Sequence, residues 1–270
     1  MPRLRTSLPG RLPTAVSGAA ARIIGSARVR IKSGPNAGLK WSVVSAGRGY
    51  ASGTFEAQRL TAIIGLLRQG DRFWDIGAHK GYVSLAAARK LGPEGQVFAF
   101  EPADSNLIFL RLHVVWNCFN NIRIIPVAVS STDGIAQFGG SGSSIAYRIG
   151  HGTGVARTRT IRALVEQDSL PLPTVLKIDA EGSEAEILRD GLSCLPGDVL
   201  IWVSLHSREL YEECRSLLQS RGYTLVESKS LKSCASEKNG SWKSDPELLA
   251  VGPERDLTDA ELRLLEQSFT

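Results

Sequence analysis

The sequence predicts an α/β fold built from βαβ units around a parallel sheet. Short apolar runs alternate with amphipathic helical stretches from residue 72 to residue 227, which is the pattern of such units. Gly and Pro residues mark the ends of several of these runs, and acidic residues lie at or just after the ends of three of the predicted strands. No internal repeat is present, and no domain boundary is expected within residues 50–252.

Composition is that of a globular protein. The chain has 270 residues and a mass of 29.1 kDa, enough for one large domain or two small ones. With 43% hydrophobic and 22% charged residues, dominant disorder and a fibrous repeat are excluded. No run approaches the ~18–20 apolar residues of a membrane-spanning helix. The cysteines, none in a C-x-x-C pair, are expected to be reduced thiols: Cys118, Cys194, Cys214 and Cys234.

Basic residues are concentrated at the N-terminus. Residues 1–50 contain nine Lys and Arg residues and no acid, whereas the net charge of the chain is only +5. The rest of the chain is therefore net negative. A basic arm suits peripheral contact with an anionic surface, such as phospholipid or nucleic acid. The alternative interpretations of this basic segment are an organelle transit peptide and an unstructured leader. Since no export signal is evident, we expect a cytoplasmic protein.

Each predicted element follows from its own pattern. Alternating apolar residues on both sides of residues 34–38 predict a β-hairpin within residues 27–45. An apolar stripe ended by Gly70 predicts a helix over residues 55–69. Strands are expected over residues 72–76, 96–100, 122–129, 174–178, 199–205, 223–227 and 248–251, and helices over residues 81–91, 102–117, 184–190 and 208–221.

Three regions depart from this alternation. Residues 135–138 and 158–164 predict a β insertion around a mobile Gly-rich loop, which is either a lid or simple disorder. Residues 229–246 form a Lys- and Ser-rich loop, and Thr258 with Glu261 form a capping box that opens a C-terminal helix. The expected organisation is a basic arm (1–26), a domain (27–252, hairpin 27–45, core 55–252) and a C-terminal helix (253–270).

The turn after the first core strand is the clearest candidate site. Asp75 ends the strand, Gly77 follows, and Gly81 opens the next helix, in the pattern D-x-G-x-x-x-G. Ligands of doubly wound sheets bind beyond the strand ends. Gly77 would let a ligand lie against the backbone, and Gly81 would let the helix approach the sheet. The turn lacks the G-x-G-x-x-G of dinucleotide sites, and a carboxylate opposes a pyrophosphate. It suits a cation, such as the amino group or sulfonium of S-adenosylmethionine.

Glu101 supports the same cofactor. It ends the next strand, 26 residues after Asp75. A carboxylate at this place can accept hydrogen bonds from both ribose hydroxyls of an adenosine. Taken alone, Asp75 also fits a turn former and Glu101 an ordinary charge at a strand end. Their occurrence at consecutive strand ends favours a cofactor site.

A second acidic cluster follows the fourth core strand. Asp179 and Glu181 lie at its carboxyl end, and Lys177 is placed to pair with them or to contact substrate. Asp179 could orient or deprotonate an acceptor hydroxyl, and His206, after the next strand, could be a general base. Capping of the following helix is the plain alternative for the acids. The spacing of Asp179, Glu181 and His206 matches no metal-binding pattern, so no metal is expected. Without a G-x-S-x-G motif, a nucleophilic serine is unsupported.

These motifs resemble those of the FkbM family of S-adenosylmethionine-dependent methyltransferases, over residues 29–252. The resemblance rests on Gly34-Pro35-Asn36-x-Gly38-Leu39-Lys40, Phe73-Trp74-Asp75-Ile76-Gly77-Ala78-x-x-Gly81, Val97-Phe98-Ala99-Phe100-Glu101-Pro102, Ala128-Val129-Ser130 and Lys177-Ile178-Asp179-x-Glu181-Gly182-x-Glu184. The last string is the most particular to the family. The resemblance implies a doubly wound, Rossmann-like sheet of seven strands with helices on both faces and a hairpin as the last strand pair.

The resemblance also implies O-methylation of a hydroxyl on a small molecule, glycan or secondary metabolite. By matching position, the cofactor-binding residues are Asp75, Gly77, Ala78, His79, Gly81, Glu101, Pro102 and Ala128, and the candidate catalytic residues are Asp179, Glu181 and His206. Two positions depart from the family pattern. His79 replaces the usual Asn, and Ser204 replaces the Glu of an E-x-H arrangement.

Loss of that acid leaves a non-catalytic nucleoside-binding protein as an alternative function. An RNA methyltransferase that uses the basic arm is a second alternative, although acids at the acceptor face would repel phosphate.

Overall fold

The computed structural model describes residues 27–45, 47–140, 148–227, 231 and 246–269. The predicted basic arm, the centre of the predicted Gly-rich lid and nearly all of the predicted Lys- and Ser-rich loop lie outside the described residues. Of the helices described, none has both the length and the apolar character needed to cross a membrane. Cys118, Cys194 and Cys214 are free thiols, and Cys234 lies outside the described residues.

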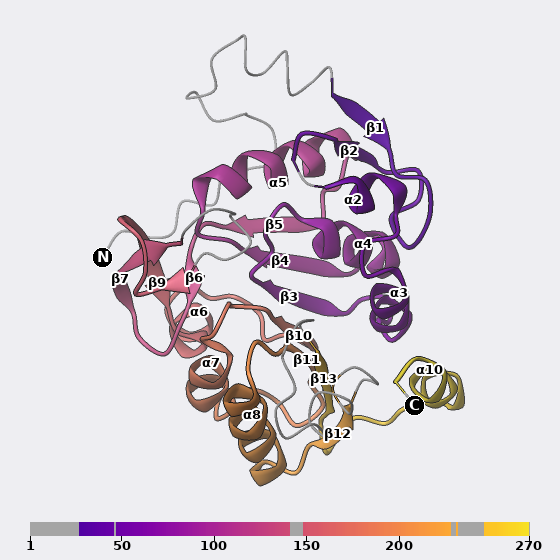
Figure 1. The fold of residues 1–270 in the computed structure, drawn as a ribbon. Helices are drawn as coiled ribbons and strands as arrows, with labels where there is room; N and C mark the ends of the chain where they lie inside the picture. The colour runs from indigo at the N-terminus through magenta and orange to yellow at the C-terminus, as the bar shows by residue number, and fades with distance from the viewer. Residues whose placement is uncertain (1–26, 46, 141–147, 228–230, 232–245, 270) are drawn as a thin grey trace.

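Seven strands form one sheet, as the resemblance implies (Figure 1). Their order is β12 (Thr224–Glu227), β13 (Glu247–Val251), β11 (Leu200–Ser204), β10 (Val175–Ile178), β3 (Arg72–Ile76), β4 (Gln96–Phe100) and β5 (Ile122–Ile125). Neighbours from β11 to β5 run parallel, whereas β13 is antiparallel to both β12 and β11. The predicted α/β fold is confirmed. The carboxyl ends of β3, β4 and β10 meet at one edge, where ligands bind in such sheets.

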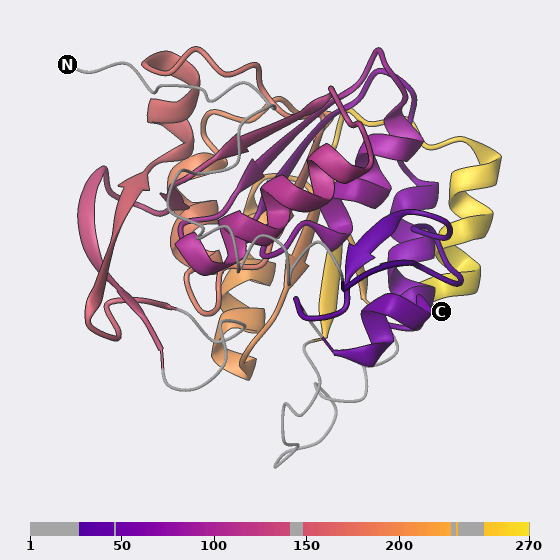
Figure 2. The ribbon, with the colours of Figure 1, turned by 90° about the horizontal axis from the view of Figure 1, so that it is seen from above.

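Side-chain alternation along the strands divides the core into two layers. On β3, Phe73 packs into one layer and Trp74 into the other, because successive side chains point to opposite faces of a sheet. The layer of Phe73 includes residues of α3 (Ala57–Gly65), α4 (Tyr82–Leu91), α5 (Asp104–Trp116) and α10 (Asp259–Phe269). The layer of Trp74 includes residues of α6 (Ile161–Glu166), α7 (Glu184–Gly191) and α8 (Arg208–Ser220). Helices therefore cover both faces, as Figures 1 and 2 show.

An N-terminal segment packs against the first of these layers. β1 (Arg28–Arg30) and β2 (Lys40–Ser42) pair antiparallel, which confirms the predicted hairpin. Helix α2 (Arg48–Ser52) follows and was not predicted. Trp41 stacks on His113 of α5 with ring centroids 3.8 Å apart, and the Asn36 amide donates a hydrogen bond to the Tyr82 carbonyl. These contacts fix residues 50–56 beside the edge of the sheet.

A small sheet of order β6-β9-β7-β8 follows β5 and corrects two predictions. The strand predicted over residues 122–129 is two strands, β5 and β6 (Ala128–Val129), separated by Pro126, which has no N–H for the ladder. The prediction of a strand over residues 158–164 is wrong after residue 159, because a helix follows there. β9 is Gly154–Arg159, and Thr160 caps α6 by accepting a hydrogen bond from the Ala163 N–H.

The other predictions for this insertion and for the C-terminus have different outcomes. β7 (Gly134–Gly139) confirms the strand predicted at residues 135–138, while β8 (Arg148–Ile149) lies within the segment predicted as loop. The capping box of the C-terminal helix is confirmed. The Thr258 N–H donates to the Glu261 carboxylate, and the Glu261 N–H donates to the Thr258 hydroxyl.

Candidate active site

A cavity opens at the carboxyl edge of the sheet and encloses about 1150 Å³, including the solvent space at its mouth. It is lined by residues 76–79, 100–102, 127–129, 177 and 179–181. These residues lie at or just after the carboxyl ends of β3, β4, β5 and β10, so the cavity lies where these parallel strands end. Ligands of doubly wound sheets bind at this edge.

The turn after β3 lies close to the backbone of the turn after β10. Gly77 has φ +75°, and a Cβ atom there would lie 1.8 Å from the Asp179 carbonyl oxygen. Glycine is therefore required where this turn meets the turn after β10. Gly77 also lines the cavity, so a ligand lying against its backbone stays a prediction. At Gly81 a Cβ atom would lie 2.4 Å from Leu110 Cδ1, so this glycine admits α5 rather than the sheet.

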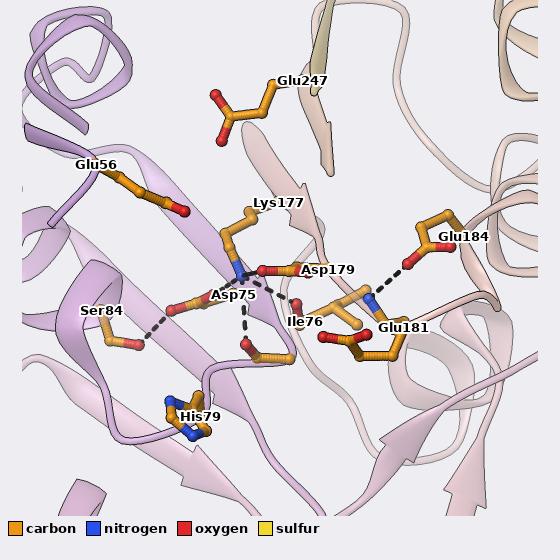
Figure 3. A network of polar contacts seen from close by, with 12 residues as sticks. Glu56, Asp75, Ile76, His79, Ser84, Lys177, Asp179, Glu181, Glu184 and Glu247 are labelled. Atoms are coloured by element: carbon orange, nitrogen blue, oxygen red, sulfur yellow. Dashed lines mark hydrogen bonds and ion pairs between the residues drawn. The ribbon is translucent and has the colours of Figure 1, made fainter. Parts of the chain in front are cut away.

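Asp75 is completely buried and does not line the cavity. Its Oδ2 accepts a hydrogen bond from the Ser84 hydroxyl at 2.5 Å, and its Oδ1 lies 3.0 Å from Lys177 Nζ. Figure 3 shows this carboxylate beneath the ammonium group of Lys177. Asp75 thus acts on the cavity through Lys177.

Lys177 contacts both the buried Asp75 and Asp179 in the cavity wall. Its Nζ lies 3.5 Å from Asp179 Oδ2 and donates to the carbonyls of Ile76 and Gly77 at 3.4 and 3.3 Å. Burial disfavours the charge of this ammonium, but Asp75 and Asp179 more than offset that effect and raise the pKa of Lys177. The side chain is therefore a fixed cation that holds Asp179 in place.

Glu101 is held by three donors at the end of β4. Its Oε1 accepts from the Ala103 N–H at 2.8 Å and the Asn106 amide at 3.3 Å, and its Oε2 accepts from the His79 N–H at 2.8 Å. Burial nevertheless raises the pKa of Glu101 to about 7. A carboxylate offers about four acceptor sites, so capacity remains on Oε2 for a hydroxyl in the cavity. Asn106 also lines the cavity, and its buried Oδ1 has no hydrogen-bond partner among the described residues.

His79 contributes its backbone to this arrangement. It has φ +51°, a left-handed conformation that Asn tolerates better than most residues. The conformation directs its N–H at Glu101. Burial lowers the pKa of the imidazole to about 4, so the ring is neutral at pH 7.

The turn after β10 carries the second pair of acids. Asp179 and Glu181 both line the cavity, with side chains 34% and 20% exposed. Glu181 has φ +52°, and the turn is held by Glu184, which accepts hydrogen bonds from the N–H groups of Ala180 and Gly182. Ser183 is the N-cap residue of α7, and no side-chain capping bond forms there. Asp179 and Glu181 are thus not the capping groups of this helix.

His206 lies between three carboxylates. Its Nε2 is 3.6 Å from Asp179 Oδ1 and 3.6 Å from Glu181 Oε2, and its Nδ1 is 3.1 Å from Glu184 Oε1. Burial disfavours the imidazolium, but Glu184, Asp179 and Glu181 outweigh burial and raise the pKa of His206 to about 9. The ring is therefore a cation at pH 7. Ligand atoms of Asp179, Glu181 and His206 all lie within 4.8 Å of one another, an approach that their spacing in sequence did not indicate.

One wall of the cavity was not foreseen from the sequence. Tyr50, Phe55 and Glu56 come from the N-terminal segment and line it. Tyr50 and Phe55 stack with ring centroids 4.0 Å apart, and Glu56 pairs with Arg59 at 2.8 Å. Their only local signal is the aromatic character of residues 50 and 55, which also fits ordinary core packing.

The structure brings most of the predicted site residues together. Of the eight predicted cofactor-binding positions, the cavity is lined by Gly77, Ala78, His79, Glu101, Pro102 and Ala128, and not by Asp75 or Gly81. Of the predicted catalytic residues, Asp179 and Glu181 line the cavity. His206 does not line it, but its Nε2 lies 3.6 Å from each of these two carboxylates.

Residues 75–225 match the model of the methyltransferase FkbM domain. The hexuronic acid methyltransferase AglP of Haloferax volcanii is 30% identical over 150 residues, which cover 52% of this chain and 57% of that protein. The chain thus spans little more than half the length of this relative.

Solved methyltransferase structures are also similar. Methyltransferase FkbM from Methylobacillus flagellatus has a TM-score of 0.46 and 18% identity, covering 69% of this chain and 45% of that chain. Precorrin-6y C5,15-methyltransferase from Geobacter metallireducens has a TM-score of 0.46 and 18% identity, covering 73% of this chain and 87% of that chain.

Proposed function

Because the chain belongs to the methyltransferase FkbM domain family, we propose that it transfers a methyl group from S-adenosylmethionine to a hydroxyl oxygen of a glycan or small molecule. The observation that carries the proposal is the placement of Glu101 and Asp179 on one cavity, each directly after a parallel strand. Glu101 suits a nucleoside ribose, and Asp179 suits an acceptor hydroxyl.

Several groups fit the cofactor. Glu101 has acceptor capacity left for a ribose hydroxyl, and the unpartnered Oδ1 of Asn106 is a second acceptor nearby. Phe100 and Val127 supply apolar surface for a base. When bound, S-adenosylmethionine supplies an electrophilic methyl group on a positively charged sulfur. A negatively charged cavity wall favours such a ligand.

The chain aligns the acceptor and receives its proton. Alignment of an oxygen lone pair with the reactive methyl group accounts for much of the rate enhancement in such displacements. Asp179 accepts the hydroxyl proton, since it is partly exposed to the cavity and held by Lys177. His206 is already protonated at pH 7 and positions Asp179 and Glu181 instead. We therefore assign Asp179 as the base.

A sugar hydroxyl is the acceptor that we favour. The Haloferax relative is named a hexuronic acid methyltransferase, and its similarity to this chain supports a glycan or sugar acceptor.

The test is a methyl-transfer assay with labelled S-adenosylmethionine and a panel of hydroxylated acceptors. We expect a labelled ether product with at least one acceptor, and a large loss of turnover in Asp179→Asn with S-adenosylhomocysteine binding retained. A protein that binds neither S-adenosylmethionine nor S-adenosylhomocysteine would contradict the proposal. Asp198→Asn, an exposed change of the same chemistry, is the matched control.

A further inference from the structure

Six of the residues that line the cavity supply ring surfaces and carboxylates. We call them the acceptor half, because the proposed function places the acceptor beside Asp179: Tyr50, Phe55, Glu56, Asp179, Glu181 and Trp202. The rings of Tyr50 and Phe55 are stacked, and burial raises the pKa of Tyr50, so its hydroxyl stays protonated. Apolar rings beside a few convergent acceptors are typical of a site for a small polyhydroxylated molecule.

The cation nearest to this half is already engaged. Of the described residues that line the cavity, Lys177 is the one with a permanent positive charge. Its Nζ lies between the carboxylates of Asp75 at 3.0 Å and Asp179 at 3.5 Å. His79, the other basic residue of the lining, is neutral because burial lowers its pKa to about 4. Neither residue offers a charge to an incoming anion.

Two further cations lie behind the wall and are also paired. Arg59 lies 2.8 Å from Glu56 and 3.5 Å from the buried Glu247. Burial raises the pKa of Glu247 to about 8, so Glu56 is the charged partner at pH 7. Figure 3 shows Glu56 and Glu247 on the same side of Lys177.

His206 is the second of these cations. It lies 3.6 Å from both Asp179 and Glu181, and 3.1 Å from Glu184. Even without Glu247, the carboxylates among the described residues around the acceptor half outnumber the cations: Glu56, Asp75, Asp179, Glu181 and Glu184 against Arg59, Lys177 and His206. A ligand carboxylate placed there would be repelled, and it would compete with Asp179 and Glu181 for Lys177 and His206.

We infer that the acceptor is an uncharged, polyhydroxylated molecule, a neutral sugar unit, and not a uronate. The inference rests on the proposed function, because that function places the acceptor beside Asp179. Carboxylates accept hydrogen bonds from sugar hydroxyls without repulsion. The same wall therefore binds a neutral hexose and discriminates against its uronic acid, which differs only in the oxidation of C6.

The test measures binding to the protein saturated with S-adenosylhomocysteine, so that it does not depend on turnover. Calorimetric titrations compare methyl glycosides of glucose, galactose and mannose with the corresponding uronic acids and with the methyl esters of those acids. The esters keep the C6 carbonyl of the uronate, remove its charge and add one methyl group. Each series is run in EDTA and in Mg²⁺, because a cation held by Asp179, Glu181 and His206 would add positive charge to the acceptor half.

We expect at least one neutral glycoside to bind about tenfold or more tightly than its uronic acid in both media, with the ester close to the neutral form. Glu56→Gln should reduce severalfold the difference in affinity between the neutral glycoside and its uronic acid. Glu166→Gln, a change in an exposed ion pair with Arg162, should leave this difference unchanged. Equal or tighter binding of the uronic acids in either medium would overturn the inference, as would no binding of any neutral glycoside. Methyl transfer to a uronic acid in parallel samples would uphold the proposed function while overturning this inference.

Discussion

Lys177 Nζ lies 3.0 Å from Asp75 Oδ1, and this buried ion pair holds the Lys177 side chain in the wall of the cavity. Asp75 has no exposed surface, whereas Lys177 reaches both the cavity and Asp179. Asp75, the acid in the clearest sequence motif, thus contacts a residue of the cavity wall and not the cavity itself. Its role is to fix the cation that positions the proposed base.

Asp75→Asn should destabilise the protein strongly. The substitution leaves Lys177 buried with only the more distant Asp179, and breaking a buried pair from one side costs about 3 kcal/mol or more. Denaturant unfolding measures the loss. The double variant Asp75→Asn, Lys177→Met should recover most of it, because no unpaired charge then remains buried. A single variant within about 0.5 kcal/mol of the exposed control Asp198→Asn would contradict the assignment.

Affinity for S-adenosylhomocysteine should depend on the ionisation of Glu101. Burial raises the pKa of this acid to about 7, and only its ionised form offers all its oxygens to ribose hydroxyls. Affinity should therefore rise about tenfold from pH 6 to pH 8 and then level off. Glu101→Gln should bind about 10- to 100-fold more weakly and lose this pH dependence. Calorimetry at several pH values measures this affinity. The same dependence of affinity on pH in the wild type and in Glu101→Gln would exclude Glu101 as its source.

The pH dependence of turnover should separate the two base candidates. The nearby carboxylates raise the pKa of His206 to about 9, so at neutral pH most molecules carry the cation and few can accept a proton there. With Asp179 as the base, kcat should be level near neutral pH and fall as His206 loses its proton above pH 9. His206→Gln should lower kcat about tenfold and abolish that fall. A rate that instead climbs through pH 9 in the wild type would identify His206 as the base.

His79 should tolerate replacement according to backbone conformation. Its φ of +51° directs its N–H at Glu101, and its ring is neutral. His79→Asn should keep S-adenosylhomocysteine affinity within about threefold, because Asn accepts this conformation. His79→Val should lose about tenfold, since a β-branched residue is strained by about 1–2 kcal/mol there. Equal losses in both variants would show that the imidazole itself matters.

The regular part of the fold was readable from local patterns. Residues 72–76 and 96–100 are strands with the predicted bounds, because each is a short, mainly apolar run with an acid near its carboxyl end and a turn after it. Residues 158–164 were misread because a short apolar run fits a strand as well as a helix. Thr160, which caps α6 there, was the unused signal.

The site was predictable only where it is local in the chain. Asp179 and Glu181 share one turn, and Glu101 directly follows its strand, so their positions followed from strand ends. Tyr50 and Glu56 reach the cavity only because Trp41 and Asn36 dock their segment on α4 and α5. Such long-range packing leaves no pattern in a single sequence. The burial of Asp75 was missed for the same reason, because its partner Lys177 lies on another strand.

A crystal structure of the protein with bound S-adenosylhomocysteine tests the central claim most directly. The account predicts that a ribose hydroxyl lies within hydrogen-bond distance of Glu101 Oε2 and that the sulfur faces the side of the cavity bearing Asp179. A nucleoside bound elsewhere, or a ribose without contact to Glu101, would contradict it.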